Sequence, residues 1–166
     1  PVRAVLTVTV SDPGGEIVAR KTERREVPRG RVRANFELEV PSPALWEPAT
    51  PNLYSLSAVL VPETGPADRR DVTYGYRDFR VRDGWFELNG KRIYAKGAYL
   101  FGSIFGASVP LGAAQDPGTA RRIVGNLRAA GFNLFRLHNV ATQPEMLELC
   151  DRLGLLVIPS HGASYL

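Results

Sequence analysis

Side chains that could do chemistry gather where one apolar stretch ends. Arg136, His138 and Asn139 close the segment Phe132–Leu137, which has the composition of a short buried strand. Successive side chains of a strand alternate between its faces, so Arg136 and His138 share a face. A parallel α/β sheet binds its ligands at the carboxyl ends of its strands. We therefore expect Arg136 to meet a carboxylate there, supplied from outside this chain. An arginine in a framework ion pair is the alternative.

Two helices are predicted to flank this strand. One begins near Asp116 with Pro117 in its first turn, and Gly131 ends it. The other begins at a capping box around Thr142, and Gly154 ends it. The apolar strand Leu155–Ile158 follows. Strand, helix and strand in this order predict a parallel sheet, either a barrel or a doubly wound sheet.

The first half of the chain predicts antiparallel strands. Their expected ranges are Val2–Val10, Ile17–Val27, Val32–Val40, Leu53–Val61 and Asp71–Arg82. Short alternating strands separated by Gly- and Pro-containing turns are typical of an immunoglobulin-like β-sandwich. We expect this sandwich over residues 1–82.

The pattern changes at Asp83-Gly84. Residues 83–166 begin with a hairpin around Asn89-Gly90, whose second strand is predicted at Arg92–Lys96. Gly97–Gly118 is interpreted as a long loop, and the βα segments follow. The expected fold is an all-β immunoglobulin-like sandwich followed by the first βα units of a truncated (β/α)8 TIM barrel.

Composition excludes some classes of function. The chain has 166 residues, 44% of them hydrophobic, with no apolar run long enough to span a membrane. The net charge is +4, and the basic stretch Arg20–Arg33 also holds Glu23 and Glu26. We interpret this stretch as a solvated edge strand and expect no nucleic-acid partner. Because the sequence starts at Pro1, we expect it to be part of a longer chain whose remainder is its partner. We make no prediction of the cellular compartment.

The sequence contains no pattern typical of a metal site, a nucleotide cofactor site or a reactive cysteine. Cys150 is the single cysteine and lies on the apolar side of a predicted helix, so we expect a buried structural thiol. His138 and His161 lack metal-ligand spacing. No glycine-rich phosphate-binding motif occurs. We predict no metal and no cofactor.

Three blocks carry a resemblance to a known family. They are Leu45-Trp-Glu-Pro-Ala-Thr-Pro-Asn-Leu-Tyr-Ser-Leu56, then Gly75-Tyr-Arg with Arg82-Asp-Gly-Trp-Phe-Glu-Leu-Asn-Gly-Lys-Arg92, and finally Ala130-Gly-Phe-Asn-Leu-Phe-Arg136 with Leu149-Cys-Asp-Arg-Leu-Gly-Leu-Leu-Val157. In this order they resemble glycoside hydrolase family 2, the β-galactosidase, β-glucuronidase and β-mannosidase group. The first is similar to that family's immunoglobulin-like domain, the second to the crossing into its barrel, and the third to its second and third barrel strands.

The resemblance implies a retaining hydrolase of β-linked sugars. Such enzymes use two carboxylates about 5 Å apart. In the family these are glutamates on later strands, so no residue of this chain is predicted to be catalytic, and the chain alone is expected to be inactive. Arg136 is implied to lie near the nucleophile. With His138, Asn139 and Tyr99 it forms the predicted substrate-binding set, although Tyr99 is also explained as packing at the barrel mouth.

The sequence departs from the family at three places. The family often has histidine at the position of Asn139, has a histidine in the loop that Gly97–Ser103 replaces, and has an acidic pair at Pro159-Ser160. The leading hypothesis is a fragment of a retaining β-glycosidase, and the alternative is a non-catalytic carbohydrate-binding or scaffolding protein of the same architecture.

Overall fold

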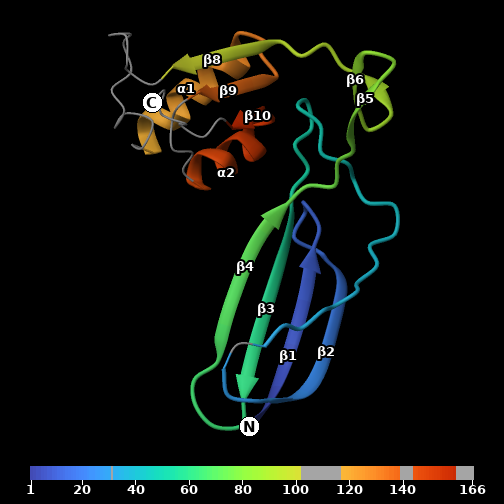
Figure 1. The fold of residues 1–166 in the computed structure, drawn as a ribbon, viewed down its shortest axis with the longest axis vertical. Coiled ribbons are helices and arrows are strands. Elements are labelled where there is room, and N and C mark those ends of the chain that lie inside the picture. The colour runs from blue at the N-terminus through green and yellow to red at the C-terminus, as the bar shows by residue number, and fades with distance from the viewer. Residues whose placement is uncertain (31, 102–116, 139–143, 160–166) are drawn as a thin grey trace, which may run out of the picture. The chain divides into compact units, whose positions relative to one another are not determined.

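The computed structural model describes residues 1–30, 32–101, 117–138 and 144–159 (Figure 1). The chain forms two compact units. Unit 1 consists of Pro1–Ala44 and Leu53–Tyr74, and unit 2 consists of Leu45–Asn52 and Gly75–Leu166. Unit 2 therefore contains a short segment from within the predicted sandwich. No helix of the described part is both long and apolar enough to cross a membrane.

Unit 1 is built on one antiparallel sheet. Its strands are β1 (Val2–Ser11), β2 (Ile17–Val27), β3 (Tyr54–Pro62) and β4 (Asp68–Tyr74), in the order β2-β1-β3-β4 (Figure 1). The β1–β2 turn forms because Asp12 Oδ1 accepts hydrogen bonds from the backbone N–H groups of Gly14 and Glu16, each 2.9 Å long. Ala4, Val8 and Val10 are buried on one face. The predominance of β-structure agrees with the predicted class.

Two predicted strands of the first half differ in the structure. Val32–Val40 forms no strand, although Phe36, Leu38 and Val40 are half-buried and the residues between them are exposed. The alternation was therefore right about the faces of residues 36–40, wrong for Val32 and Ala34, which are exposed, and wrong about a hydrogen-bonded ladder. Asp71–Arg82 is two strands, β4 and β5, because Gly75 interrupts it where the backbone passes against Trp46.

Unit 2 opens with a small antiparallel meander. Its strands are β5 (Phe79–Arg82), β6 (Trp85–Leu88) and β7 (Lys91–Arg92). Asp83-Gly84 and Asn89-Gly90 each have positive φ at both residues, the geometry of a two-residue hairpin turn. The predicted division between residues 82 and 83 falls inside the first of these hairpins, whereas the compact units part after Tyr74. The domain boundary itself stays a prediction.

The rest of unit 2 is a parallel sheet with two helices. Its elements are β8 (Gly97–Phe101), α1 (Pro117–Ala129), β9 (Leu134–His138), α2 (Pro144–Leu153) and β10 (Leu156–Pro159), and the strand order is β10-β9-β8 (Figure 1). The prediction of a loop throughout Gly97–Gly118 was wrong for its first five residues. Gly97 and Ala98 hide the alternation there because small residues carry no polarity signal. The predicted strand Arg92–Lys96 is confined to Lys91–Arg92.

Both helices pack on one face of the parallel sheet. The buried residues of this core are Ala120, Val124, Phe135, Leu137, Met146, Cys150 and Leu155. Phe135 and Leu137 are each 1% exposed, as strand parity predicts for the helix-facing side of β9. Gly131 and Gly154 follow the two helices with φ of 82° and 76°, the left-handed conformation that ends many helices.

Candidate functional site

The open face of the parallel sheet holds the candidate site. Strand register places Tyr99 on β8, Arg136 on β9 and Ile158 on β10 side by side in one row. The preceding row contains Gly97, Leu134 and Leu156. Tyr99 and Ile158 are 53% and 47% exposed, and Arg136 is also exposed. This face therefore presents one guanidinium within an apolar and aromatic surface.

Arg136 lies over the ring of Tyr99. Its guanidinium carbon is 5.8 Å from the ring centroid, within the range of a cation–π interaction. Among the described residues, no carboxylate lies within ion-pair distance of Arg136. The arrangement leaves the fork of N–H donors available for a planar anion such as a carboxylate. The framework ion pair considered above does not form with any described residue.

Asn133 fixes the register that brings Tyr99 beside Arg136. Its Oδ1 accepts a hydrogen bond from the Lys96 N–H, 2.8 Å long, and its Nδ2 donates to the Tyr94 carbonyl, 2.9 Å long. The Asn133 carbonyl also accepts from the Leu156 N–H on the other side. Asn133 thus aligns both neighbours of β9, through its side-chain amide on the β8 side and its backbone carbonyl on the β10 side. Sequence reasoning placed Asn133 only on a face, and an Asn just before a strand was the available signal.

Residues 45–52 anchor the helical side of the site. Trp46 is fully buried, and its Nε1 donates to the Asp151 carbonyl at the end of α2, 2.8 Å away. The Arg77 guanidinium lies over the Trp46 ring at 4.7 Å and pairs with the Asp151 carboxylate at 3.1 Å. Arg128 donates to the Pro48 carbonyl over 2.6 Å. These contacts hold the ends of both helices and so the strands that follow them. The resemblance placed this segment with the sandwich; its described contacts belong to unit 2.

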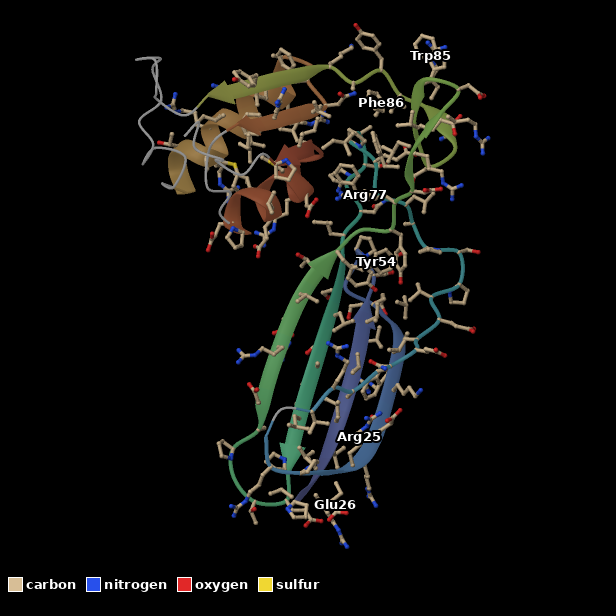
Figure 2. All side chains as sticks on the ribbon, viewed as in Figure 1. Arg25, Glu26, Tyr54, Arg77, Trp85 and Phe86 are labelled. Carbon is tan, nitrogen blue, oxygen red and sulfur yellow. The ribbon has the colours of Figure 1, made fainter. Side chains whose placement is uncertain are left out.

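An apolar hollow of about 330 Å³ continues the open face toward the hairpin. It is lined by Arg77, Phe79, Phe86, Ala95, Leu134, Leu156, Val157 and Ile158. Trp85 and Phe86 follow one another on β6 (Figure 2). The rings of Phe79 and Phe86 stack at 5.5 Å, and Trp85 is 51% exposed with the Arg92 guanidinium over its ring. Parallel sheets are normally covered on both faces, so this surface has the composition of one that packs against further structure.

The remaining predicted residues are placed as follows. His138 ends β9 in register with Phe101. Asn139 and His161 lie outside the described residues. Cys150 is fully buried as predicted, and burial, helped by the Asp151 charge, raises the pKa of its thiol to about 12. A neutral thiol in this position is a structural residue. Within the described ranges, no cluster of His, Cys, Asp and Glu side chains could hold a metal ion.

The chain is similar to known glycosidases. The model of the family "Glycosyl hydrolases family 2" matches residues 1–77. A β-galactosidase of Aeromonas hydrophila is 32% identical over 127 residues, which are 76% of this chain and 12% of that protein. A putative β-glucuronidase of Formosa agariphila is 33% identical over 119 residues, which are 71% of this chain and 14% of that protein.

Solved structures extend the similarity to the C-terminal half. A glycosyl hydrolase family 2 member from Bacteroides cellulosilyticus aligns with a TM-score of 0.81 and 29% identity, covering 97% of this chain and 22% of that one. The chain thus spans less than a quarter of the length of each of these three proteins.

Proposed function

This chain belongs to glycosyl hydrolase family 2, and from that premise we propose that it forms part of an enzyme that hydrolyses β-linked glycosides with retention. The names of its relatives, β-galactosidase and β-glucuronidase, support the substrate class. Retention requires a carboxylate nucleophile and a carboxylic acid/base about 5 Å apart. In this proposal both carboxylates come from strands outside the chain.

We also propose that the parallel sheet begins a catalytic barrel. Three consecutive strands lie in sequence order with their helices on one face, as in a barrel wall. The open face would then line the lumen, and the apolar hollow would face the missing strands. The row of Tyr99, Arg136 and Ile158 lies toward the carboxyl end, where barrel enzymes bind their substrates.

One observation carries the role of Arg136: an exposed guanidinium on the open face of a parallel sheet without a carboxylate partner among the described residues. In the proposed enzyme it holds the nucleophilic carboxylate ionised and aimed at the anomeric carbon. Tyr99 holds the guanidinium through its cation–π contact, and its ring provides an aromatic surface against which a sugar can pack. His138 and Asn139 complete the substrate-binding set at the end of the same strand.

The test uses a polypeptide that carries this chain together with the later strands. Arg136→Ala should lower kcat/KM on a chromogenic β-glycoside by roughly a hundredfold or more, because one preorganised electrostatic partner of the transition state is lost. Arg136→Lys should recover little, since a point charge does not replace a planar fork. Arg121→Ala, on the exposed side of α1, is the matched control.

Two outcomes would reject the proposal. If Arg136→Ala keeps kcat/KM but lowers the melting temperature, Arg136 serves the framework and the site lies elsewhere. If the whole protein binds the sugar but shows no turnover on β-galactosides, β-glucuronides and β-mannosides, the carbohydrate-binding alternative replaces the enzyme. This chain alone should show no turnover above a buffer blank.

A further inference from the structure

Lys96, the residue just before β8, is held by Asn133, the residue just before β9. The Asn133 Oδ1 accepts from the Lys96 N–H at 2.8 Å, and the Asn133 N–H donates to the Lys96 carbonyl at 3.1 Å. The Asn133 Nδ2 also donates to the Tyr94 carbonyl at 2.9 Å. Asparagine suits this place because its amide carries both an acceptor and a donor on one short side chain. The two strands are therefore tied together at their amino ends.

This tie decides which residue of β8 lies beside Arg136 of β9 (Figure 1). Tyr99 comes three residues after Lys96. Arg136 likewise comes three residues after Asn133. Pairing at the start of the strands thus sets Tyr99 beside Arg136, with 5.8 Å between the ring centroid and the guanidinium carbon. A slip of one residue would turn the ring toward the opposite face of the sheet.

The side chains at the start of β8 contribute little to this register. Gly97 has no side chain, and Ala98 has only a methyl group. The register of a strand is set largely by the side chains that it buries, so packing specifies a strand that begins in this way only weakly. This holds whatever structure covers the open face, since these two residues have little to bury. The hydrogen bonds of Asn133 supply the register that these side chains do not.

We propose that Asn133 is a positioning residue for the hydrolysis described above, acting through the placement of Tyr99 beside Arg136. This inference rests on the proposed function, because the placement affects the rate only if the open face serves the reaction. The ring of Tyr99 restricts where the guanidinium lies, and the guanidinium must aim its fork of donors at one carboxylate. A displacement of about 1 Å can cost a preorganised site roughly a hundredfold in rate. Asn133 acts from about 10 Å away, three residues of strand before Arg136.

Kinetics of the polypeptide that carries this chain together with the later strands give the first test. Asn133→Leu keeps the size of the side chain and removes both of its hydrogen bonds, so kcat/KM should fall by about tenfold or more. It should change kcat and KM in the same proportions as Tyr99→Ala, whereas a loss of folded protein lowers the apparent kcat and leaves KM unchanged. Asn126→Leu makes the same exchange at an exposed position of α1 and should alter neither constant. Asn133→Ala loses the same bonds with a smaller side chain and serves if the leucine prevents folding.

A double-mutant cycle shows whether Asn133 acts through Tyr99. In a Tyr99→Ala background, Asn133→Leu should lower kcat/KM by less than about threefold more, because the ring that it positions is gone. Full additivity of the two effects would overturn the proposal. An unchanged kcat/KM for Asn133→Leu, in a polypeptide that loses activity through Arg136→Ala, would also overturn it and leave the proposed function standing.

A disulfide reports the register independently of activity. Tyr99→Cys with Arg136→Cys should cross-link, because opposed residues of neighbouring strands lie about 4.8 Å apart. Tyr99→Cys with Leu134→Cys should not, since an offset of two residues separates them by about 8 Å. The buried Cys150 does not compete. Adding Asn133→Leu should lower the yield of the first pair by roughly half or more, and an unchanged yield would overturn the proposal.

Discussion

The two units bury their residues very differently. Among the residues that the structure describes, the largest fully buried side chains all belong to unit 2: Trp46, Phe135, Leu137, Leu155, Val124 and Cys150. Unit 1 is held by long antiparallel ladders, and the least exposed of its described residues is Val10, at 2%. An antiparallel sheet can be stabilised by its own turns and pairs, whereas a parallel sheet needs a core and crossover helices.

Because of this contrast, we expect substitutions to affect the stability of the two units differently. Substitutions in unit 1 remove pairs from a ladder that has many others. Substitutions in unit 2 remove contacts on which several elements depend, such as the segment 45–52. Hydrogen exchange separates the two, because amides of β1 and β3 report on unit 1 and amides of α2 and β9 report on unit 2.

Trp46→Ala is expected to have the largest effect. It empties a fully buried site and removes the hydrogen bond to the Asp151 carbonyl, so the free energy of unfolding should fall by about 3–5 kcal/mol. Exchange protection should collapse in α2 and β9 and persist in β1. Trp85→Ala is the matched control, since Trp85 is half-exposed. Equal loss of protection in both units would show that the units do not differ as described.

Gly154→Ala should come next and is best compared with Gly131→Ala. Both glycines end a helix with a similar positive φ, 76° and 82°. A Cβ on Gly154 would collide with the Pro48 carbonyl, whereas a Cβ on Gly131 would meet nothing within 4 Å. Gly131→Ala should therefore cost about 1 kcal/mol for backbone strain alone, and Gly154→Ala roughly 2–4 kcal/mol. Chemical denaturation followed through α-helix signal measures both. Equal costs would mean that residues 45–52 do not anchor α2.

Cys150 should make unit 2 sensitive to alkaline pH. Burial raises its thiol pKa from the usual 9.0 to about 12 in the folded protein. A folded-state pKa that is raised stabilises the protein below pH 9, and this contribution is lost as the pH rises from 9 to 12. The loss should be up to about 1.4 kcal/mol per pH unit. Cys150→Ala should remove this part of the pH dependence, and an unchanged slope would contradict it.

The sequence predicted local features well and long-range pairing poorly. Both helices and their apolar stripes follow from the 3.6-residue period and from Gly131 and Gly154. Parity alone placed Phe135 and Leu137 on the helix side and Arg136 on the other. Alternation in Val32–Val40 gave the inner face of its last five residues only, and no local pattern can say whether a partner strand exists.

The candidate site was also only partly predictable. Arg136 was identified from its place at the end of a strand. Its neighbour Tyr99 was assigned to a loop, because Gly97 and Ala98 carry no alternation, and it lies beside Arg136 only through the register of β8. Asn133 and Trp46 position the site through hydrogen bonds to backbone groups of distant residues. Such bonds depend on the fold and leave no periodic signal.

The smallest expected effects compare one ion pair from each unit. In unit 2, Arg77 pairs with Asp151 and covers the buried Trp46 ring. In unit 1, Arg69 pairs with Asp71 on the edge strand β4, and both side chains are more than half exposed. Arg77→Ala should cost about 1–1.5 kcal/mol because the cation–π contact and the pairing are lost together.

Arg69→Ala should give no measurable change in the free energy of unfolding. The hydrogen bond from Arg69 lowers the pKa of Asp71, which would stabilise the fold at neutral pH and be lost as the pH falls through the lowered pKa. Solvent screens a pair this exposed, however, so the contribution should vanish within error, and added salt should not alter it. Urea denaturation of both variants at pH 7 and pH 3 measures the difference. A larger loss for Arg69→Ala than for Arg77→Ala would reverse the comparison and make the edge of the antiparallel sheet the more sensitive region.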